Sequence, residues 1–226
     1  MENRIATVPA WLQERAQNAG LVTIAVLAVI ASGITVSAAV LYVDANGTNA
    51  TPPYTNWTIA ATAIQNAVDA ANAGDEIVVT NGTYATGGRA VGTQVLINRV
   101  AVDKPLTLRS VNGPQFTVIQ GYQVPGTRFS DNAIRCVYLT NGATLSGFTL
   151  TNGATSLPEP NGGGVLCEWS AVVSNCISVG NSAVYGGGAY GGTLNNCTLT
   201  GNSAERGGGA YNGTLNNCTL TGNRAT

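Results

Sequence analysis

A sequence with a period of 21 residues occurs almost twice at the end of the chain, and it constrains the fold more than any other feature. Residues 186–204 read GGGAYGGTLNNCTLTGNSA, and residues 207–225 read GGGAYNGTLNNCTLTGNRA. A fixed period of this length is typical of a solenoid, in which each repeat stacks on the one before it. Three columns of identical residues share the spacing: Cys176, Cys197 and Cys218; Asn175, Asn196 and Asn217; and Asn181, Asn202 and Asn223.

Each repeat alternates short apolar runs with turn residues. The runs Ala189–Tyr190, Thr193–Leu194 and Cys197–Thr200 are too short for helices and follow glycines or asparagines. Three short strands that return to the same place every 21 residues form one rung of a parallel β-helix. Rungs of this kind stack about 4.8 Å apart, which is the spacing of hydrogen-bonded strands.

The repeated columns have structural roles in such a rung. The Asn-Asn pair fits a tight bend, because Asn tolerates the left-handed conformation and its amide can bond to the next rung. The Gly triplet allows a sharp turn where a Cβ would collide. Leu194, Leu199 and Cys197 are expected to point inward and stack on their counterparts in the last rung. The columns could also form a ligand track, but stacking within the solenoid is the favoured interpretation.

Residues 1–38 have the pattern of an export signal. A polar segment with Arg4 and Arg15 precedes the uncharged run Leu21–Val36, and small residues follow it. This order is typical of a cleaved signal peptide, and an uncleaved membrane anchor is the alternative. Either interpretation places the remainder outside the cytoplasm: extracellular, at the cell surface or in the outer membrane.

Three segments are expected after the leader. Residues 39–57 are predicted to be irregular, residues 58–74 to form a helix that starts near Asn56 or Thr58 and ends at Gly74, and residues 75–226 to form about seven β-helix rungs. The helix would cover the exposed edge of the first rung. The last rung carries no polar cap, so a longer parent protein and end-to-end association of the chain are both expectations.

Residues 62–84 (TAIQNAVDAANAGDEIVVTNGTY) resemble the start of right-handed parallel β-helix proteins of the pectin-lyase-like superfamily. Residues 104–121 (KPLTLRSVNGPQFTVIQG) are similar to their next rungs. The late repeats resemble those of exported bacterial surface proteins and, more loosely, polymorphic outer-membrane proteins. The resemblance implies an all-β, right-handed parallel β-helix with an N-terminal capping α-helix. It says little about activity, because the superfamily includes lyases, hydrolases and adhesins.

The carboxylates do not form the pattern that a lyase or hydrolase of this superfamily would need. After Lys104 they are Asp131, Glu159, Glu168 and Glu205, which are far apart and never recur at the repeat period. Asp131 with Arg135 is the one close acid–base couple, and it is a weak catalytic candidate. Glu159 and Glu168 flank the longest late insertion and are candidates for binding sugar or metal. A Ca²⁺ cofactor is expected only if the chain is a lyase.

The five cysteines and the tyrosines each allow two interpretations. The chain has no histidine and no C-x-x-C, which argues against zinc. Buried free thiols are favoured over disulfides, and Cys167, outside the column, is the best placed to pair. Tyr190 and Tyr211 are in register, so they could contact sugar rings or stack on each other.

Charge completes the functional prediction. Only 9% of residues are charged, with 10 basic and 11 acidic, and no nucleic-acid motif is present. The regular columns of identical residues and the small number of carboxylates favour a non-enzymatic scaffold: a cell-surface adhesin, stalk or carbohydrate-contacting protein. The alternatives are a polysaccharide lyase or glycoside hydrolase whose catalytic rungs lie outside this chain, and a self-assembling array. No resident cofactor is expected for the scaffold.

Overall fold

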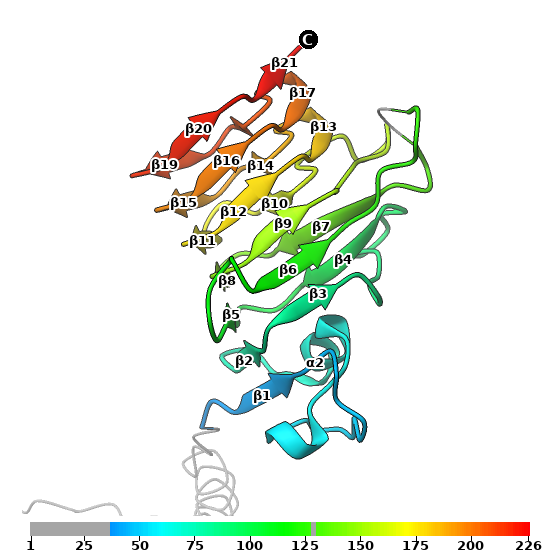
Figure 1. Ribbon diagram of the computed structural model, residues 1–226, viewed down its shortest axis with the longest axis vertical. Coiled ribbons are helices and arrows are strands. Elements are labelled where there is room, and N and C mark those ends of the chain that lie inside the picture. Colours follow the sequence, from blue (N-terminus) through cyan, green and yellow to red (C-terminus); the bar gives the residue numbers. More distant parts are fainter. Residues whose placement is uncertain (1–36, 128–129) are drawn as a thin grey trace, which may run out of the picture. The chain divides into compact units, whose positions relative to one another are not determined.

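The chain winds into a solenoid in which every pairing between its strands is parallel (Figure 1). The computed structural model describes residues 37–127 and 130–226, so the leader predicted over residues 1–38 lies outside the described residues except for its last two. Within the described residues, no helix is both long and apolar enough to span a membrane. The predicted parallel β-helix is confirmed.

The strands form four sheets, which we call A to D. Sheet A contains β1 (Val40–Val43), β2 (Glu76–Val79), β5 (Thr107–Ser110), β8 (Thr144–Ser146), β11 (Val172–Ser174), β15 (Thr193–Asn195) and β19 (Thr214–Asn216). Sheet B contains β3 (Gly82–Tyr84), β6 (Thr117–Gln120), β9 (Thr149–Thr151), β12 (Ile177–Val179), β16 (Thr198–Thr200) and β20 (Thr219–Thr221). Sheet C contains β4 (Ile97–Val102), β7 (Ile134–Leu139), β10 (Val165–Cys167), β14 (Ala189–Tyr190) and β18 (Ala210–Tyr211). Sheet D contains β13 (Ser182–Tyr185), β17 (Ser203–Arg206) and β21 (Arg224–Ala225).

The rungs are not of equal length, and this corrects the expected number. Glu76 pairs with Thr107 and Thr107 with Thr144, steps of 31 and 37 residues, whereas Val172 and Thr193 are 21 apart. The early rungs are longer because loops join sheet B to sheet C. Six strands of sheet A therefore follow residue 75, rather than seven. The late rungs also hold a fourth strand, in sheet D, where three had been expected.

The core is a set of apolar columns that run along the solenoid. Leu194 and Leu199 are buried and pair in register with Leu215 and Leu220, as the repeat predicted. The column of cysteines continues into the earlier rung as Phe148, which is fully buried. In sheets A and B, β11, β12, β15 and β16 therefore each bury their central side chain and leave the two flanking side chains partly exposed.

The bend between sheets A and B is built from asparagine. Asn175, Asn196 and Asn217 have φ values of 51°, 54° and 52°, in the left-handed region that Asn tolerates better than most residues. The Asn217 amide nitrogen donates to the Asn196 side-chain oxygen at 2.7 Å, so the exposed amides stack as expected.

A second asparagine column lies inside the solenoid, at the bend between sheets B and D. Asn181 and Asn202 are buried, and the Oδ1 atom of each rung accepts hydrogen bonds from the Asn one rung earlier. A Cβ added to Gly188 would lie 2.8 Å from the Asn202 amide nitrogen. The inner asparagines and the Gly triplets therefore require each other, because only glycine leaves room for the buried amide.

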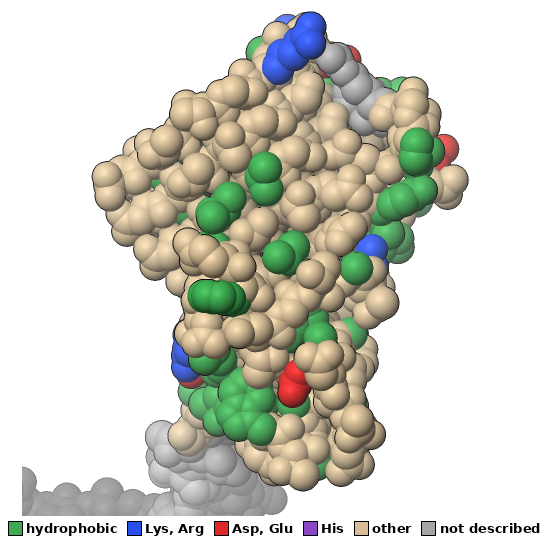
Figure 2. Space-filling view, viewed as in Figure 1, with side chains coloured by type: hydrophobic (Ala, Val, Ile, Leu, Met, Phe, Trp, Pro, Cys, Tyr) green, Lys and Arg blue, Asp and Glu red, His purple; other side chains and the backbone are tan. Residues whose placement is uncertain are grey.

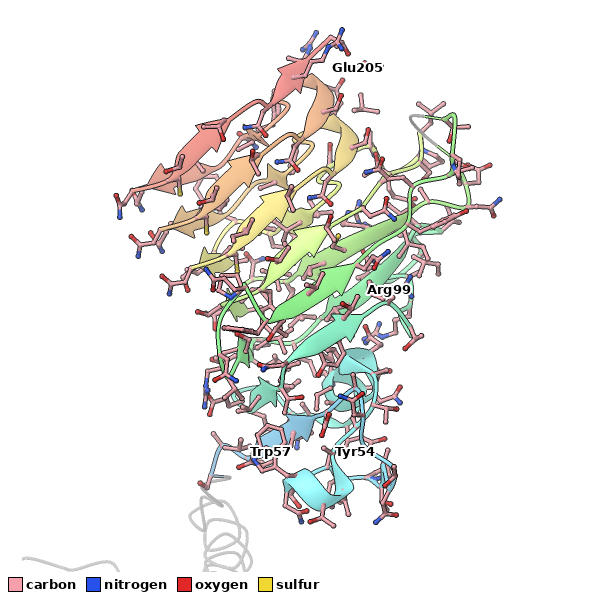
Figure 3. All side chains as sticks on the ribbon, viewed as in Figure 1. Tyr54, Trp57, Arg99 and Glu205 are labelled. Carbon is pink, nitrogen blue, oxygen red and sulfur yellow. The ribbon has the colours of Figure 1, made fainter. Side chains whose placement is uncertain are left out.

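The N-terminal end of the solenoid is covered by its own chain. Segment 39–57 is not irregular throughout, because Val40–Val43 forms β1 and pairs with β2. The backbone of Tyr42 closes the outer edge of β1. Its N–H donates to the Tyr54 carbonyl at 2.8 Å, and its carbonyl accepts from the Ala61 N–H at 2.9 Å. Figure 3 shows Tyr54 and Trp57 at this end, and the Trp57 ring contacts Tyr42 edge-on.

The capping helix is present but shorter than residues 58–74. A 3₁₀ helix, η1 (Trp57–Ile59), is capped by Asn56, and the α-helix α2 spans Ile64–Ala70. The two are separated because Ala61 is held extended against β1. The Gln65 side-chain oxygen accepts from the N–H of Ala101 in β4 at 2.7 Å. The side chain of α2 thus satisfies one backbone donor at the edge strand of sheet C.

Candidate ligand-binding site

Arg135 is a buried structural cation, and the structure does not join it to Asp131. Its side chain is fully buried. Its guanidinium donates to the carbonyls of Asn161 and Gly162 at 2.9 Å and to the Asn98 side chain at 2.6 Å. Asp131 lies exposed in the turn before β7. Burial lowers the pKa of Arg135 to about 10, so it remains charged at neutral pH while its donors hold the backbone.

Glu159 ties two loops together. Its carboxylate oxygens accept the backbone N–H groups of Val95 and Leu96 at 3.0 and 3.1 Å, and the Ser156 hydroxyl lies at 3.3 Å. The same carboxylate raises the pKa of Arg135 by attraction, which partly offsets the effect of burial. The site predicted at Glu159 is therefore already filled by the protein's own donors.

Three carboxylates in the described part of the N-terminal half are also bound by the protein itself, here through arginine side chains. Asp69 and Asp103 both pair with Arg89, at 3.0 and 2.7 Å, and Glu76 pairs with Arg109. Within residues 37–127 and 130–226, no three Asp, Glu, Cys or His residues are grouped so that they could hold a metal ion.

Glu168 is placed differently, because it borders a hollow in the surface. It accepts the Tyr138 hydroxyl at 3.1 Å, and burial followed by the charge of Glu168 raises the pKa of Tyr138, which keeps this phenol protonated. Glu168 is half-buried and has lone pairs left for a ligand.

The hollow is created by a difference in turn length between neighbouring rungs. Residues 168–171 join β10 to β11, whereas only Gly191 and Gly192 join β14 to β15 in the next rung. Both glycines have φ near +70°, and a Cβ on Gly192 would lie 2.6 Å from the Cβ of Cys167. The longer turn therefore raises Trp169 above a floor of small residues.

Trp169 is the most exposed large apolar residue described, with 91% of its surface accessible. Trp169 borders a hollow of about 220 Å³ together with Glu168, Tyr190 and Asn212. An adjoining hollow of about 420 Å³ is lined by Trp169, Asn212 and Thr193. The larger volume lies within the usual range of ligand pockets, roughly 300–1,000 Å³. We call this surface the Trp169 hollow.

Tyr190 is part of the hollow and of an aromatic cluster. Its ring stacks on Tyr211 with centroids 5.8 Å apart, and Tyr185 lies 5.4 Å from Tyr211. The stacking of Tyr190 on Tyr211 is thus observed, and the hollow leaves Tyr190 accessible as well. Tyr211 holds the ring of Tyr190 from the neighbouring rung.

All five cysteines are free thiols, and Cys167 lies buried below the hollow without a disulfide partner. Burial raises the pKa of Cys136 and Cys176 to about 12 and that of Cys197 to about 11. A thiol with so high a pKa is neutral at physiological pH and behaves as a small apolar group.

The sequence singled out Glu168 and Tyr190, which the structure places at the hollow, but it did not single out Trp169 and Asn212 beside them. The available signal was the length of the turn that contains Trp169: four residues stand at 168–171, where the next rungs have Gly191–Gly192 and Asn212–Gly213.

Comparisons with known proteins gave one similarity. No protein-family model and no curated protein matched the chain. Among solved structures, a rhamnogalacturonan lyase is similar, with a TM-score of 0.49 and 13% sequence identity over 80% of this chain and 51% of that one. The chain thus spans about half the length of that protein. The parallel β-helix itself is established by the strand register described above.

Proposed function

We propose that this chain is an exported, non-enzymatic β-helix scaffold that binds carbohydrate through the Trp169 hollow. The observation that carries the proposal is the exposed Trp169 ring, held above small residues and beside Tyr190, Glu168 and Asn212. Trp169 exposes 91% of its surface in a chain with only 6% aromatic residues, and the proposal rests on its position at the border of two adjacent hollows rather than on its exposure alone.

The side chains of the hollow suit a sugar. The faces of Trp169 and Tyr190 offer apolar area for the C–H face of a pyranose ring. Glu168 accepts hydrogen bonds, and the exposed amide of Asn212 both donates and accepts. Because the described lining contains a carboxylate and no Lys or Arg, we propose neutral sugars rather than uronic acids as ligands.

The disposition of the carboxylates favours a scaffold over an enzyme. Glycoside hydrolysis requires two carboxylates flanking the bond, and a Ca²⁺-dependent lyase requires several converging oxygen ligands. Here Glu159 is taken up by backbone N–H groups, and Glu168 stands alone in the hollow. Arg135, the weak candidate for a base, is enclosed by carbonyl groups.

Export is proposed from the leader pattern of residues 1–38, in which a polar, Arg-containing segment precedes the apolar run Leu21–Val36. A role at the cell surface, as an adhesin or stalk, fits a rigid solenoid with a lateral sugar-binding hollow.

The test is a binding screen of the purified protein against neutral and acidic oligosaccharides, with Trp169→Ala beside the wild type. Each ligand that binds is then incubated with the protein, and the solution is assayed for reducing ends and for unsaturated products by ultraviolet absorbance. We expect binding of neutral sugars, loss of binding in Trp169→Ala and no product. Product formation would refute the scaffold, and the absence of any binding would refute the carbohydrate site.

A further inference from the structure

A second hollow lies at the corner between sheets A and B. Its volume is about 310 Å³, at the lower end of the usual range of ligand pockets, roughly 300–1,000 Å³. It shares no lining residue with the Trp169 hollow. The lining comes from one loop and two successive rungs, and it includes Pro114, Gln115, Asn175, Ile177, Asn196 and Thr198. We call this surface the Gln115 hollow.

The loop that joins β5 to β6 creates this hollow. The loop spans residues 111–116, whereas two residues make the same connection in each of the later rungs. It lies against the outside of the next rung, because the Thr149 hydroxyl donates to the Pro114 carbonyl at 2.7 Å. The loop therefore holds Pro114 and Gln115 beside the corner of the rungs that follow.

The column of exposed asparagine amides is interrupted at the Gln115 hollow. Asn217 donates to the Asn196 side-chain oxygen at 2.7 Å, but among the described residues no such bond joins Asn196 to Asn175. Within the same part of the chain, the amide nitrogen of Asn196 and the whole side-chain amides of Asn175 and Gln115 have no hydrogen-bond partner in the protein. Three exposed carboxamides with unused donors and acceptors thus border one hollow.

Ile177 gives the hollow an apolar wall. In its column on sheet B it pairs with Thr149 and Thr198, and Thr219 follows in the next rung, so the rung at the hollow replaces a hydroxyl by carbon. Pro114, which like Ile177 is half-buried, adds a second apolar group. In Figure 2, which looks onto sheet B, no charged side chain lies over β12 or β16. The described lining of the hollow therefore combines carboxamides with apolar carbon and contains no charged residue.

We propose that the Gln115 hollow binds the acetamido group of an N-acetylated amino sugar. Such a group has one N–H donor, one carbonyl acceptor and one methyl group. Because the N–H and the carbonyl of a trans amide point in opposite directions, the group needs partners on two sides. The amide of Gln115 comes from the loop, and those of Asn175 and Asn196 come from the corner. Ile177 and Pro114 remove the methyl group from water.

Other ligand classes fit this lining less well. A phosphate or carboxylate would find no Lys or Arg in the described lining. A sugar with hydroxyl groups alone would leave the surface of Ile177 facing water. The inference goes beyond the proposed function, because it concerns a hollow that is separate from Trp169. The background variant Trp169→Ala removes the ring from the first hollow and leaves the lining of the second intact, so the two proposals fail independently.

The experiment is saturation-transfer NMR on the purified Trp169→Ala protein with two uncharged oligosaccharides of the same linkage and length. One consists of N-acetylglucosamine and the other of glucose, so the two differ only by the acetamido groups. Ile177→Thr gives β12 the residue that β9 and β16 carry at the same place, and Gln115→Ala removes the loop amide. Thr219→Ala is the matched control, because it lies in the same column but outside the lining. Circular dichroism confirms that each variant is folded.

We expect the N-acetylated oligosaccharide to bind about tenfold more tightly than the glucose oligosaccharide, as one or two added hydrogen bonds would provide. Its methyl protons should receive the most saturation. Its affinity should fall about fivefold in Ile177→Thr and in Gln115→Ala and stay unchanged in Thr219→Ala. Equal affinities for the two sugars, or equal affinities in all variants, would overturn the proposal. Binding that occurs in the wild type and vanishes in Trp169→Ala would also overturn it, because the sugar would then occupy the Trp169 hollow.

A third probe distinguishes two sources of the acetamido group. In a peptidoglycan strand every second sugar also carries a carboxylate, for which the described lining offers no cation. We expect this strand to bind more weakly than the uncharged oligosaccharide of N-acetylglucosamine. Tighter binding of the strand would overturn the preference for an uncharged ligand.

Discussion

Replacing Asn202 by Ala removes a buried amide that joins three consecutive rungs. Asn202 is fully buried, and its Oδ1 accepts from the backbone N–H of Asn181 at 3.0 Å and from the Asn181 side chain at 3.1 Å. Its own amide nitrogen donates to the Ser178 carbonyl and to the Asn223 side chain, both at 2.9 Å. The substitution therefore deletes four hydrogen bonds.

The expected cost follows from which groups lose their only partner. In Asn202→Ala the buried N–H of Asn181 has no acceptor left, and a buried orphan of this kind costs about 1–3 kcal/mol. The Asn223 oxygen still accepts from the backbone N–H of residue 202, so that bond is replaced in part. We expect the free energy of unfolding to fall by about 3 kcal/mol.

The assay is chemical denaturation followed by far-ultraviolet circular dichroism, with Asn195→Ala as the matched control. Asn195 lies on the outside of the same rung and accepts one exposed bond from Asn216, so its loss should cost less than about 0.5 kcal/mol. Hydrogen exchange at the Asn181 amide should also quicken in Asn202→Ala alone. Equal denaturation midpoints for the two variants would refute the structural role of the inner asparagine column.

Three further perturbations test other parts of the structure. Gly188→Ala would place a methyl group 2.5 Å from a carbonyl oxygen of the next rung, and it should lower the free energy of unfolding by about 2–3 kcal/mol. Gly201→Ala has open space around the new methyl group but a φ of +61°, and it should lower the free energy of unfolding by about 1 kcal/mol. Equal melting temperatures for the two variants would contradict this. Gln65→Leu removes the acceptor of the Ala101 N–H at the edge of β4, so hydrogen exchange of the Ala101 amide should become at least tenfold faster. An unchanged exchange rate would show that the bond from Ala101 to the Gln65 side chain is dispensable. The pKa of Cys136 is raised by burial from 9.0 to about 12, so the folded state retains its proton longer than the unfolded state. Stability from this thiol is complete below pH 9 and falls by about 1.4 kcal/mol per pH unit between 9.0 and about 12. The other buried thiols contribute slopes of the same sign, so Cys136→Ala should reduce the total slope by this amount, and an identical slope would refute it.

The late rungs could be predicted from sequence because identical residues recur at identical spacing. Leu199 and Cys197 had to face inward once the strand between Asn196 and Gly201 was recognised, and the left-handed Asn196 followed from residue type. The fourth strand was missed because Ser203–Arg206 has little β character of its own. It is held in place by pairing with its neighbours in sheet D.

The N-terminal end was harder to predict because tertiary contacts override local patterns there. Val40–Val43 continues the small, apolar composition of the leader, and only its pairing with β2 identifies it as a strand. The helix predicted over residues 58–74 is shortened to Ile64–Ala70, because Ala61 is held extended to close the edge of β1. The Trp169 hollow depends on turn lengths in successive rungs, which no single repeat displays.

The most direct test of the proposed carbohydrate site is the dissociation constant of the best oligosaccharide from the screen, measured by titration calorimetry. The wild type is compared with Trp169→Ala and with Trp57→Ala, whose ring is also exposed but packs on Tyr42 at the N-terminal end. Loss of a stacked aromatic ring should weaken binding about tenfold, which corresponds to about 1.4 kcal/mol. We predict this loss for Trp169→Ala and no change for Trp57→Ala. Equal affinities for all three proteins would contradict the assignment of the Trp169 hollow as the binding site.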